Sequence, residues 1–158
     1  MATDGELAFY KESQFHNLAK TGYLVTSSQT ATYNCFAWAA VQDDRWWSPG
    51  ESGTGASYYW IDGVPDELTI AAFVQAYETL GYSICEDGEL DEGFEKIALY
   101  ATSDGEVTHA ARQLPNGMWT SKLGRWEDIE HELAGLVCEM YGSVWQFLRR
   151  QFYLKEKQ

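Results

Sequence analysis

Basic residues are scarce in this sequence. Eleven Lys and Arg residues stand against 24 Asp and Glu residues, so the formal net charge is −13 at pH 7. Binding to a nucleic-acid backbone depends on Lys and Arg side chains that displace condensed counterions, and anionic membranes attract proteins through the same charges. The charge therefore argues against free nucleic acid and membrane surfaces as partners. The partners that this charge allows are basic proteins, basic peptides and neutral small molecules.

Long apolar runs are missing as well. The longest stretch without Asp, Glu, Lys or Arg covers residues 21–42 and is rich in Ser, Thr, Asn and Gln, which a membrane helix does not tolerate. The first eleven residues include Asp4 and Glu6 and contain no apolar core of a secretory signal. We therefore expect a cytoplasmic protein.

Cysteine is too sparse for a disulfide framework. The three cysteines, Cys35, Cys85 and Cys138, form no CxxC pair, and together with the three histidines they do not match zinc-site spacing. No glycine-rich phosphate loop or dinucleotide fingerprint is present. We expect no metal and no cofactor, and we interpret Cys85 and Cys138 as small buried hydrophobic residues.

The sequence does contain what an ordinary globular domain needs. Its 158 residues, with 45% hydrophobic and 22% charged residues, correspond to one domain at the usual size of roughly 100–200 residues. We expect residues 1–32 to form a leader segment and residues 33–150 to form the core of a single domain spanning residues 1–158.

Hydrophobic periodicity and turn residues predict a mixture of helices and strands. The predicted helices cover residues 6–20, 33–41, 65–80 and 127–141, and the predicted strands cover residues 82–85, 96–101, 107–114, 118–123 and 144–148. The segments 103–105 (Ser-Asp-Gly) and 115–117 (Pro-Asn-Gly) are hairpin signals, so the central strands should form an antiparallel meander. This order indicates the α+β class.

Cys35 and His109 form the most informative pair. Cys35 falls in the first turn of a predicted helix, where the partial positive charge and free N–H groups stabilise a thiolate. His109 lies on a predicted strand far downstream, and a histidine opposite such a cysteine can take its proton. The alternative is that His109 is a partly buried strand residue whose ring binds a backbone carbonyl.

The hairpin at residues 115–117 determines which side chain lies beside His109. Strand alternation places Val107, His109 and Ala111 on one face. A three-residue loop places Ser121 on that face, diagonal to His109, whereas a two-residue loop shifts the register by one and places Thr120 there. Either hydroxyl could orient the imidazole, and Gly117 favours the three-residue loop and Ser121.

Three segments carry a family resemblance. They read YNCFAWA at residues 33–39, VTHA at 107–110 and MWTSKLG at 118–124. The chain resembles an uncharacterised bacterial family that is itself similar to the papain-like cysteine hydrolases, including the NlpC/P60-like enzymes. The resemblance covers roughly residues 20–150 and implies a papain-like core, in which a helix carrying the cysteine packs on an antiparallel sheet carrying the histidine.

The resemblance also implies roles for individual residues. Cys35 matches the nucleophile and His109 the general base. Gln29, six residues before Cys35, matches a side-chain oxyanion donor, and Asn34 is a competing donor. These enzymes usually carry Asn, Asp, His or Gln as the third member, whereas this sequence has Ser121 or Thr120 on the matching strand.

Aromatic residues cluster in the long segment 43–62. Long loops inside a compact domain are usually functional or disordered, and aromatic residues argue against disorder. We expect Trp46, Trp47 or Trp60 to form a wall of the Cys35 pocket, and Trp119 to share the face of His109. The alternative is that these aromatic residues belong to the core.

Two further patterns are charged. Asp128 and His131, on one face of the predicted helix 127–141, could hold a metal, but a solvated helix face is the better interpretation. The acidic run at residues 86–92 is interpreted as a charged loop or as an attractor for a basic partner.

These observations lead to two hypotheses about function. The first is a cysteine hydrolase that cleaves an amide or ester bond of a protein or peptide substrate, and the charge of −13 favours a basic substrate. The second is a non-catalytic acidic binding protein of the immunity type, on the same fold, that masks a basic partner. The oligomeric state does not follow from the sequence.

Overall fold

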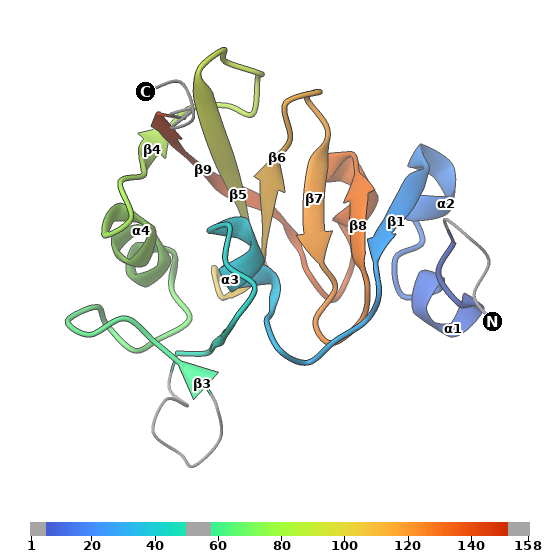
Figure 1. Cartoon of the computed structure of the whole chain (residues 1–158), viewed down its shortest axis with the longest axis horizontal. Coiled ribbons are helices and arrows are strands. Elements are labelled where there is room, and N and C mark those ends of the chain that lie inside the picture. Colours follow the sequence, from blue (N-terminus) through green and yellow to red (C-terminus); the bar gives the residue numbers. More distant parts are fainter. Residues whose placement is uncertain (1–5, 50–57, 152–158) are drawn as a thin grey trace.

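The computed structural model describes residues 6–49 and 58–151 (Figure 1). Within these ranges, seven strands form one sheet in the order β1-β8-β7-β6-β5-β9-β4, and the pairings between neighbours are antiparallel. Two short strands, β2 (Trp46–Trp47) and β3 (Tyr58–Tyr59), form a separate parallel pair. The α+β class expected from the sequence is confirmed.

The sheet is built largely from the second half of the chain. Its strands are β1 (Tyr23–Ser27), β4 (Ser83–Cys85), β5 (Phe94–Ala101), β6 (Val107–Gln113), β7 (Trp119–Lys122), β8 (Asp128–His131) and β9 (Ser143–Gln151). The helices are short: α1 (Phe9–Glu12), α2 (Leu18–Thr21), α3 (Cys35–Ala39), α4 (Ile70–Glu78) and the 3-10 helix η1 (Leu133–Leu136). No helix in the described ranges has the length and apolarity to cross a membrane.

Two cores cover the two faces of the sheet. Along β5, Ile97 and Leu99 belong to one core while Ala98 and Tyr100 belong to the other, as strand alternation requires. The first core contains α3, most of α4, Trp47 and Trp60; we call it the α3 core. The second contains residues of α2, β7, β8 and η1; we call it the η1 core. Figure 1 shows α3 against the middle of the sheet, with α4 near β4 and with α1 and α2 beyond β1.

The predicted meander is confirmed. Strands β5, β6 and β7 occupy the three ranges expected between residues 96 and 123. The β6–β7 turn is the three-residue loop: the Leu114 N–H donates to the Met118 carbonyl at 2.7 Å, and Gly117 has φ +89°, which favours glycine. This register pairs Arg112 with Thr120.

One expectation within β6 is wrong. Val107 does not share a face with His109 and Ala111, because Tyr100 pairs with His109 while the next residue of β5 pairs with Val107. The strand therefore contains a bulge that returns Val107 to the α3 core.

The helix predicted for residues 127–141 is also wrong. Residues Asp128–His131 form β8, which pairs with β7 on one side and β1 on the other. Only residues Leu133–Leu136 are helical, as a single 3-10 segment. The apolar spacing suggested a helix, but hydrogen bonds from two distant strands decide the conformation of this segment.

The other predicted helices are real but shorter. The segment 6–20 divides into α1 and α2. The segment 65–80 becomes helical only at Ile70, because Thr69 is its N-cap and accepts a hydrogen bond from the Ala72 N–H at 3.1 Å. Strands β4 and β9 occupy the two remaining predicted strand ranges.

Gly142 provides a stability test of the junction between η1 and β9. A Cβ at Gly142 would lie 2.0 Å from the Ala101 carbonyl oxygen, and its φ is +78°. Gly142→Ala should therefore lower the free energy of unfolding by clearly more than the roughly 1–2 kcal/mol of left-handed strain alone. Gly63→Ala is the matched control, because Gly63 has φ +86° and no atom lies within 4 Å of the added Cβ. Urea denaturation measures both free energies of unfolding, and an equal decrease in the two variants would contradict the close contact between Gly142 and Ala101.

Candidate functional site

Asn34 fixes the start of α3. Its Oδ1 accepts hydrogen bonds from the backbone N–H groups of Ala37 (3.3 Å) and Trp47 (3.1 Å), and its Nδ2 donates to the Trp47 carbonyl at 2.6 Å. Both ends of the amide are thus engaged in capping the helix and holding β2 against it. Cys35 is the first residue of α3, as the sequence predicted.

Opposing influences act on the Cys35 thiol. Burial is the largest and raises its pKa to about 12, although the backbone N–H groups of Ala110, Phe36 and Cys35 and the charge of Lys122 favour the thiolate. The side chain belongs to the α3 core, and the residue is only 6% exposed. Cys35 is therefore a neutral thiol at physiological pH.

His109 and Ser121 are hydrogen-bonded, as the three-residue hairpin predicted. His109 Nε2 lies 2.9 Å from Ser121 Oγ. Thr120, the alternative partner, points to the other face, where its hydroxyl accepts a hydrogen bond from the Trp38 indole. The hairpin register thus identified the hydroxyl that contacts His109.

The chain of hydrogen bonds continues beyond Ser121. Ser121 Oγ lies 2.7 Å from His131 Nε2, and His131 Nδ1 lies 2.7 Å from the Glu132 carbonyl oxygen. All three side chains are fully buried. Burial lowers the pKa of His131 to about 4 and that of His109 well below its usual value, so both rings are neutral.

The Glu132 carbonyl determines which atom carries the proton in each hydrogen bond of this series. A carbonyl only accepts, so the proton of neutral His131 lies on Nδ1 and its Nε2 is an acceptor. The Ser121 hydroxyl must then donate to His131, and its oxygen accepts the Nε2 proton of His109. The Nδ1 atom of His109 is left with a lone pair, and it has no hydrogen-bond partner among the described residues.

Two tyrosines enclose the His109 ring. Tyr141 stacks on it with ring centres 4.2 Å apart and an interplanar angle of 14°, and Tyr100 meets it edge-on at 5.3 Å. Both tyrosines belong to the η1 core. The ring is therefore held in one orientation from three sides: by Ser121, Tyr100 and Tyr141.

Cys35 meets β6 beside His109. Its sulfur lies against the backbone N–H of Ala110, the residue that follows His109. The paired residues of β6 and β7 end at Arg112–Thr120, so the two strands have separated where the sulfur approaches. Among the described residues, no hydrogen bond joins the Cys35 thiol to the His109 ring. Cys35 belongs to the α3 core, whereas the His109 ring packs against Tyr100 and Tyr141 of the η1 core, on the other face of the sheet.

The remaining predicted residues have structural contacts. Gln29 is exposed, and its Oε1 accepts a hydrogen bond from Lys11 Nζ at 2.7 Å. Lys11 also forms an ion pair with Glu127 at 2.9 Å. These contacts tie the segment before α3 to the start of β8.

The four tryptophans differ in exposure. Trp47 (1% exposed) and Trp60 (6%) are in the α3 core, where Trp47 stacks on Tyr77 with ring centres 5.4 Å apart. Trp119 (4%) lies in the η1 core against Phe147. Trp46 alone is half-buried, and it lines a cavity of about 440 Å³ together with Ala31, Thr32, Asp44, Arg45 and Tyr58.

Sequence reasoning considered His131 only with Asp128 on a predicted helix, and it missed Lys122. His131 could have been found from the alternation of Ile129 and His131, had the segment been interpreted as a strand. Lys122 is fully buried; its Nζ donates to the carbonyls of Thr30 (2.6 Å) and Gly124. Burial lowers the pKa of Lys122 to about 8. No group of metal ligands occurs in the described ranges.

The buried histidine His131 should make stability fall in acid. Its pKa is about 4 in the folded protein and near 6.5 when unfolded, so the unfolded chain binds more protons between these values. The free energy of unfolding should decrease as the pH falls from 6.5 to 4. In His131→Asn, thermal denaturation across this range should show a shallower pH dependence. An unchanged slope of stability against pH would mean that His131 does not have a lowered pKa in the folded protein.

Comparison with known proteins gives a family but no activity. The family model described as "Domain of unknown function (DUF7689)" matches residues 24–149, which include Cys35, His109, Ser121 and His131. No curated protein and no solved structure matches the chain. The chain belongs to the DUF7689 family of domains of unknown function.

Proposed function

We propose that this protein is a cysteine hydrolase that acts on an amide or ester bond, with Cys35 as nucleophile and His109 as general base. The observation that carries the proposal is the free lone pair on His109 Nδ1, on a ring tied through its other nitrogen to Ser121 and located next to the residue whose N–H meets the Cys35 sulfur. One nitrogen is oriented and the other is available to a thiol.

The chemistry starts from a neutral pair. His109 Nδ1 accepts the thiol proton as the sulfur attacks the substrate carbonyl, and the leaving group takes that proton as its bond to the carbonyl carbon breaks. Water, activated by the same nitrogen, then cleaves the thioester, and the proton returns to the Cys35 sulfur. The N–H groups at the start of α3 face the sulfur and are the available donors for the developing oxyanion. Both ends of the Asn34 side-chain amide already form hydrogen bonds with the backbone of Trp47 and Ala37. Backbone N–H groups are therefore better oxyanion donors than the Asn34 side chain.

The described structure corresponds to a closed state of such a site. Cys35 and His109 are buried, and no hydrogen bond joins them among the described residues. Because the thiol and the ring belong to the cores on opposite faces of the sheet, catalysis requires β6 and β7 to move apart between residues 107 and 111, where no residue of β6 pairs with β7, so that the ring can reach the thiol. The papain-like resemblance, with Cys on a helix, His on a strand and the third residue on the next strand, supports the same assignment.

Covalent labelling tests the nucleophile. With p-nitrophenyl acetate as an ester probe, the acetyl group should appear on Cys35 by mass spectrometry and should be lost in Cys35→Ala and His109→Ala. Cys85→Ser is the matched control, because Cys85 is more exposed and lies on β4, away from α3. Acetylation of Cys85 alone in the folded protein would refute the proposal, and undiminished acetylation of Cys35 in His109→Ala would exclude His109 as base.

Ser121 should matter less than the nucleophile or the base. Ser121→Ala removes one neutral hydrogen bond to His109, worth about 0.5–1.5 kcal/mol, so acetylation should slow by roughly 2- to 13-fold. The measurement is the rate of p-nitrophenol release by the variant and by the parent protein. A complete loss with intact folding would mean that Ser121 does more than orient the ring.

The pH dependence should follow the burial of His109. The base must be neutral, and its pKa lies well below 6.5, so the rate of acetylation should hold as the pH falls to 6.5 and decline only in stronger acid. Exposed imidazole measured in parallel should lose reactivity near its own pKa of about 6.5. A decline centred on 6.5 in the protein would contradict the buried neutral base.

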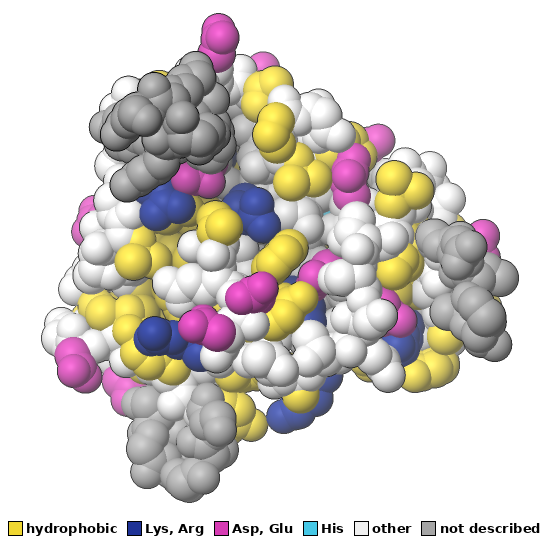
Figure 2. Space-filling view, in the orientation of Figure 1, with side chains coloured by type: hydrophobic (Ala, Val, Ile, Leu, Met, Phe, Trp, Pro, Cys, Tyr) yellow, Lys and Arg dark blue, Asp and Glu magenta, His cyan; other side chains and the backbone are white. Residues whose placement is uncertain are grey.

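A specific observation favours a second function. The raised pKa of Cys35 and the closed pair also fit a non-catalytic binding protein that uses its charge of −13 to bind a basic partner. Figure 2, however, shows acidic, basic and apolar side chains interspersed on the viewed face, without one large acidic patch. Failure of Cys35 to react with either p-nitrophenyl acetate or iodoacetamide in the folded protein would favour this second function.

A further inference from the structure

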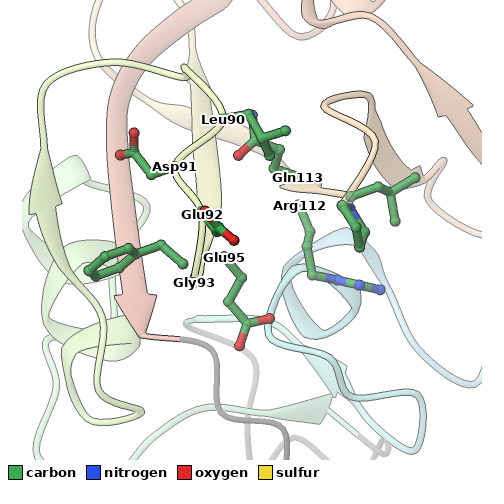
Figure 3. Close-up of a pocket in the computed structure, with 10 residues that line it drawn as sticks. Leu90, Asp91, Glu92, Gly93, Glu95, Arg112 and Gln113 are labelled. Atoms are coloured by element: carbon green, nitrogen blue, oxygen red, sulfur yellow. The ribbon is translucent and has the colours of Figure 1, made fainter.

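An open cavity lies at the end of the sheet, where β5 begins and β6 ends. Its volume is about 560 Å³, within the range of small-ligand sites. One wall is the segment 90–95, and the opposite wall is Arg112, Gln113, Leu114 and Pro115 (Figure 3). This cavity contains none of the residues assigned to the proposed hydrolase, and the inference does not rest on that function.

Arg112 contributes a guanidinium group with unused donors. Its Nε donates to the Trp38 carbonyl at 3.2 Å, and the group lies 4.9 Å from the Trp38 ring centre. Its two terminal nitrogens have no hydrogen-bond or ion-pair partner among the described residues. Two parallel N–H donors of this kind match a carboxylate.

The carboxylates near Arg112 are already paired. Glu95 forms an ion pair with Arg150 at 2.9 Å, and Asp91 pairs with Lys96 at 3.0 Å. Figure 3 shows Arg112 and Glu95 extending to the same side of the cavity from neighbouring strands. Because Arg150 neutralises Glu95, the Arg112 charge remains available to an anion from outside the chain.

Gln113 adds an unused acceptor. The residue is 5% exposed and lines the cavity; its Nε2 donates to the Gly88 carbonyl at 2.7 Å. Its Oε1 is buried and has no hydrogen-bond partner in the described part of the chain. Because this oxygen is closed to solvent, a ligand N–H can reach it only when the Gln113 side chain shifts towards the cavity.

The rest of the lining is apolar or acidic. The apolar side chains are Leu90, Phe94, Leu114 and Pro115. Glu92 and Asp91 also line the cavity, and they disfavour ligands with several negative charges. The preferred ligand therefore has one carboxylate, an apolar body and a backbone-like N–H.

We propose that this cavity binds the carboxylate end of a short apolar peptide. Arg112 holds the terminal carboxylate, and the four apolar side chains hold the last side chain. A shift of the Gln113 side chain brings Oε1 to a peptide N–H. Side chains of successive strand residues leave on opposite sides, so Arg112 and Gln113 are best bridged by an extended ligand rather than by a single small ion.

Titration of the full-length protein with acetyl-Leu-Leu, followed by NMR chemical shifts, tests the assignment. The acid should bind at least about tenfold more tightly than its C-terminal amide, because only the acid pairs with Arg112. Acetate should bind more weakly than the dipeptide acid. Equal affinity of acid and amide, or no binding of the acid at up to about 10 mM, would overturn the proposal.

Two arginine variants separate this contact from overall charge. Arg112→Gln should weaken binding of acetyl-Leu-Leu by about tenfold or more. Arg125→Gln is the control, because Arg125 also lies over a tryptophan ring, Trp46 at 5.0 Å, but outside the cavity. Equal weakening by both variants, with unchanged melting temperatures, would assign the effect to net charge and refute the site.

Discussion

The hydrogen bond from His131 Nδ1 to the Glu132 carbonyl, at 2.7 Å, determines the chemistry of the candidate site. A carbonyl cannot donate, so this contact selects the tautomer of His131 and, through the Ser121 hydroxyl, that of His109. The free nitrogen of His109 is consequently an acceptor. The contact depends in turn on β8, which ends at His131 and buries its side chain completely.

Burial then determines the charge state of the same groups. It raises the pKa of Cys35 and lowers those of His109 and His131, so desolvation outweighs the helix N–H groups that favour a thiolate. A preformed thiolate–imidazolium pair is therefore disfavoured, and the proposed hydrolase would start from a neutral pair that transfers its proton during attack. The stacking of Tyr141 on His109 belongs to the same arrangement, since it excludes water from the ring.

The sequence predicted those parts of the molecule that depend on local chemistry. The Pro-Asn-Gly loop set the β6–β7 register and so selected Ser121 over Thr120, and Asn34 marked the start of α3. The helix prediction for residues 127–141 was wrong because pairing with β1 and β7 decides the conformation of Asp128–His131, and no local pattern encodes that pairing. His131 was placed on a helix for that reason, and its contact with Ser121 could not be anticipated.

In the proposed hydrolase, Ser121 would stand where papain-like enzymes usually carry Asn, Asp, His or Gln as the third member. A carboxylate would stabilise the imidazolium by its negative charge. Ser121 offers only its hydroxyl oxygen to His109 and donates its proton to a neutral His131. The buried imidazolium therefore lacks a counter-charge apart from the thiolate or oxyanion formed in the same step. If the proposed function holds, such a site would favour a mechanism in which proton transfer and bond formation occur together, and Cys35 would stay protonated until a substrate binds.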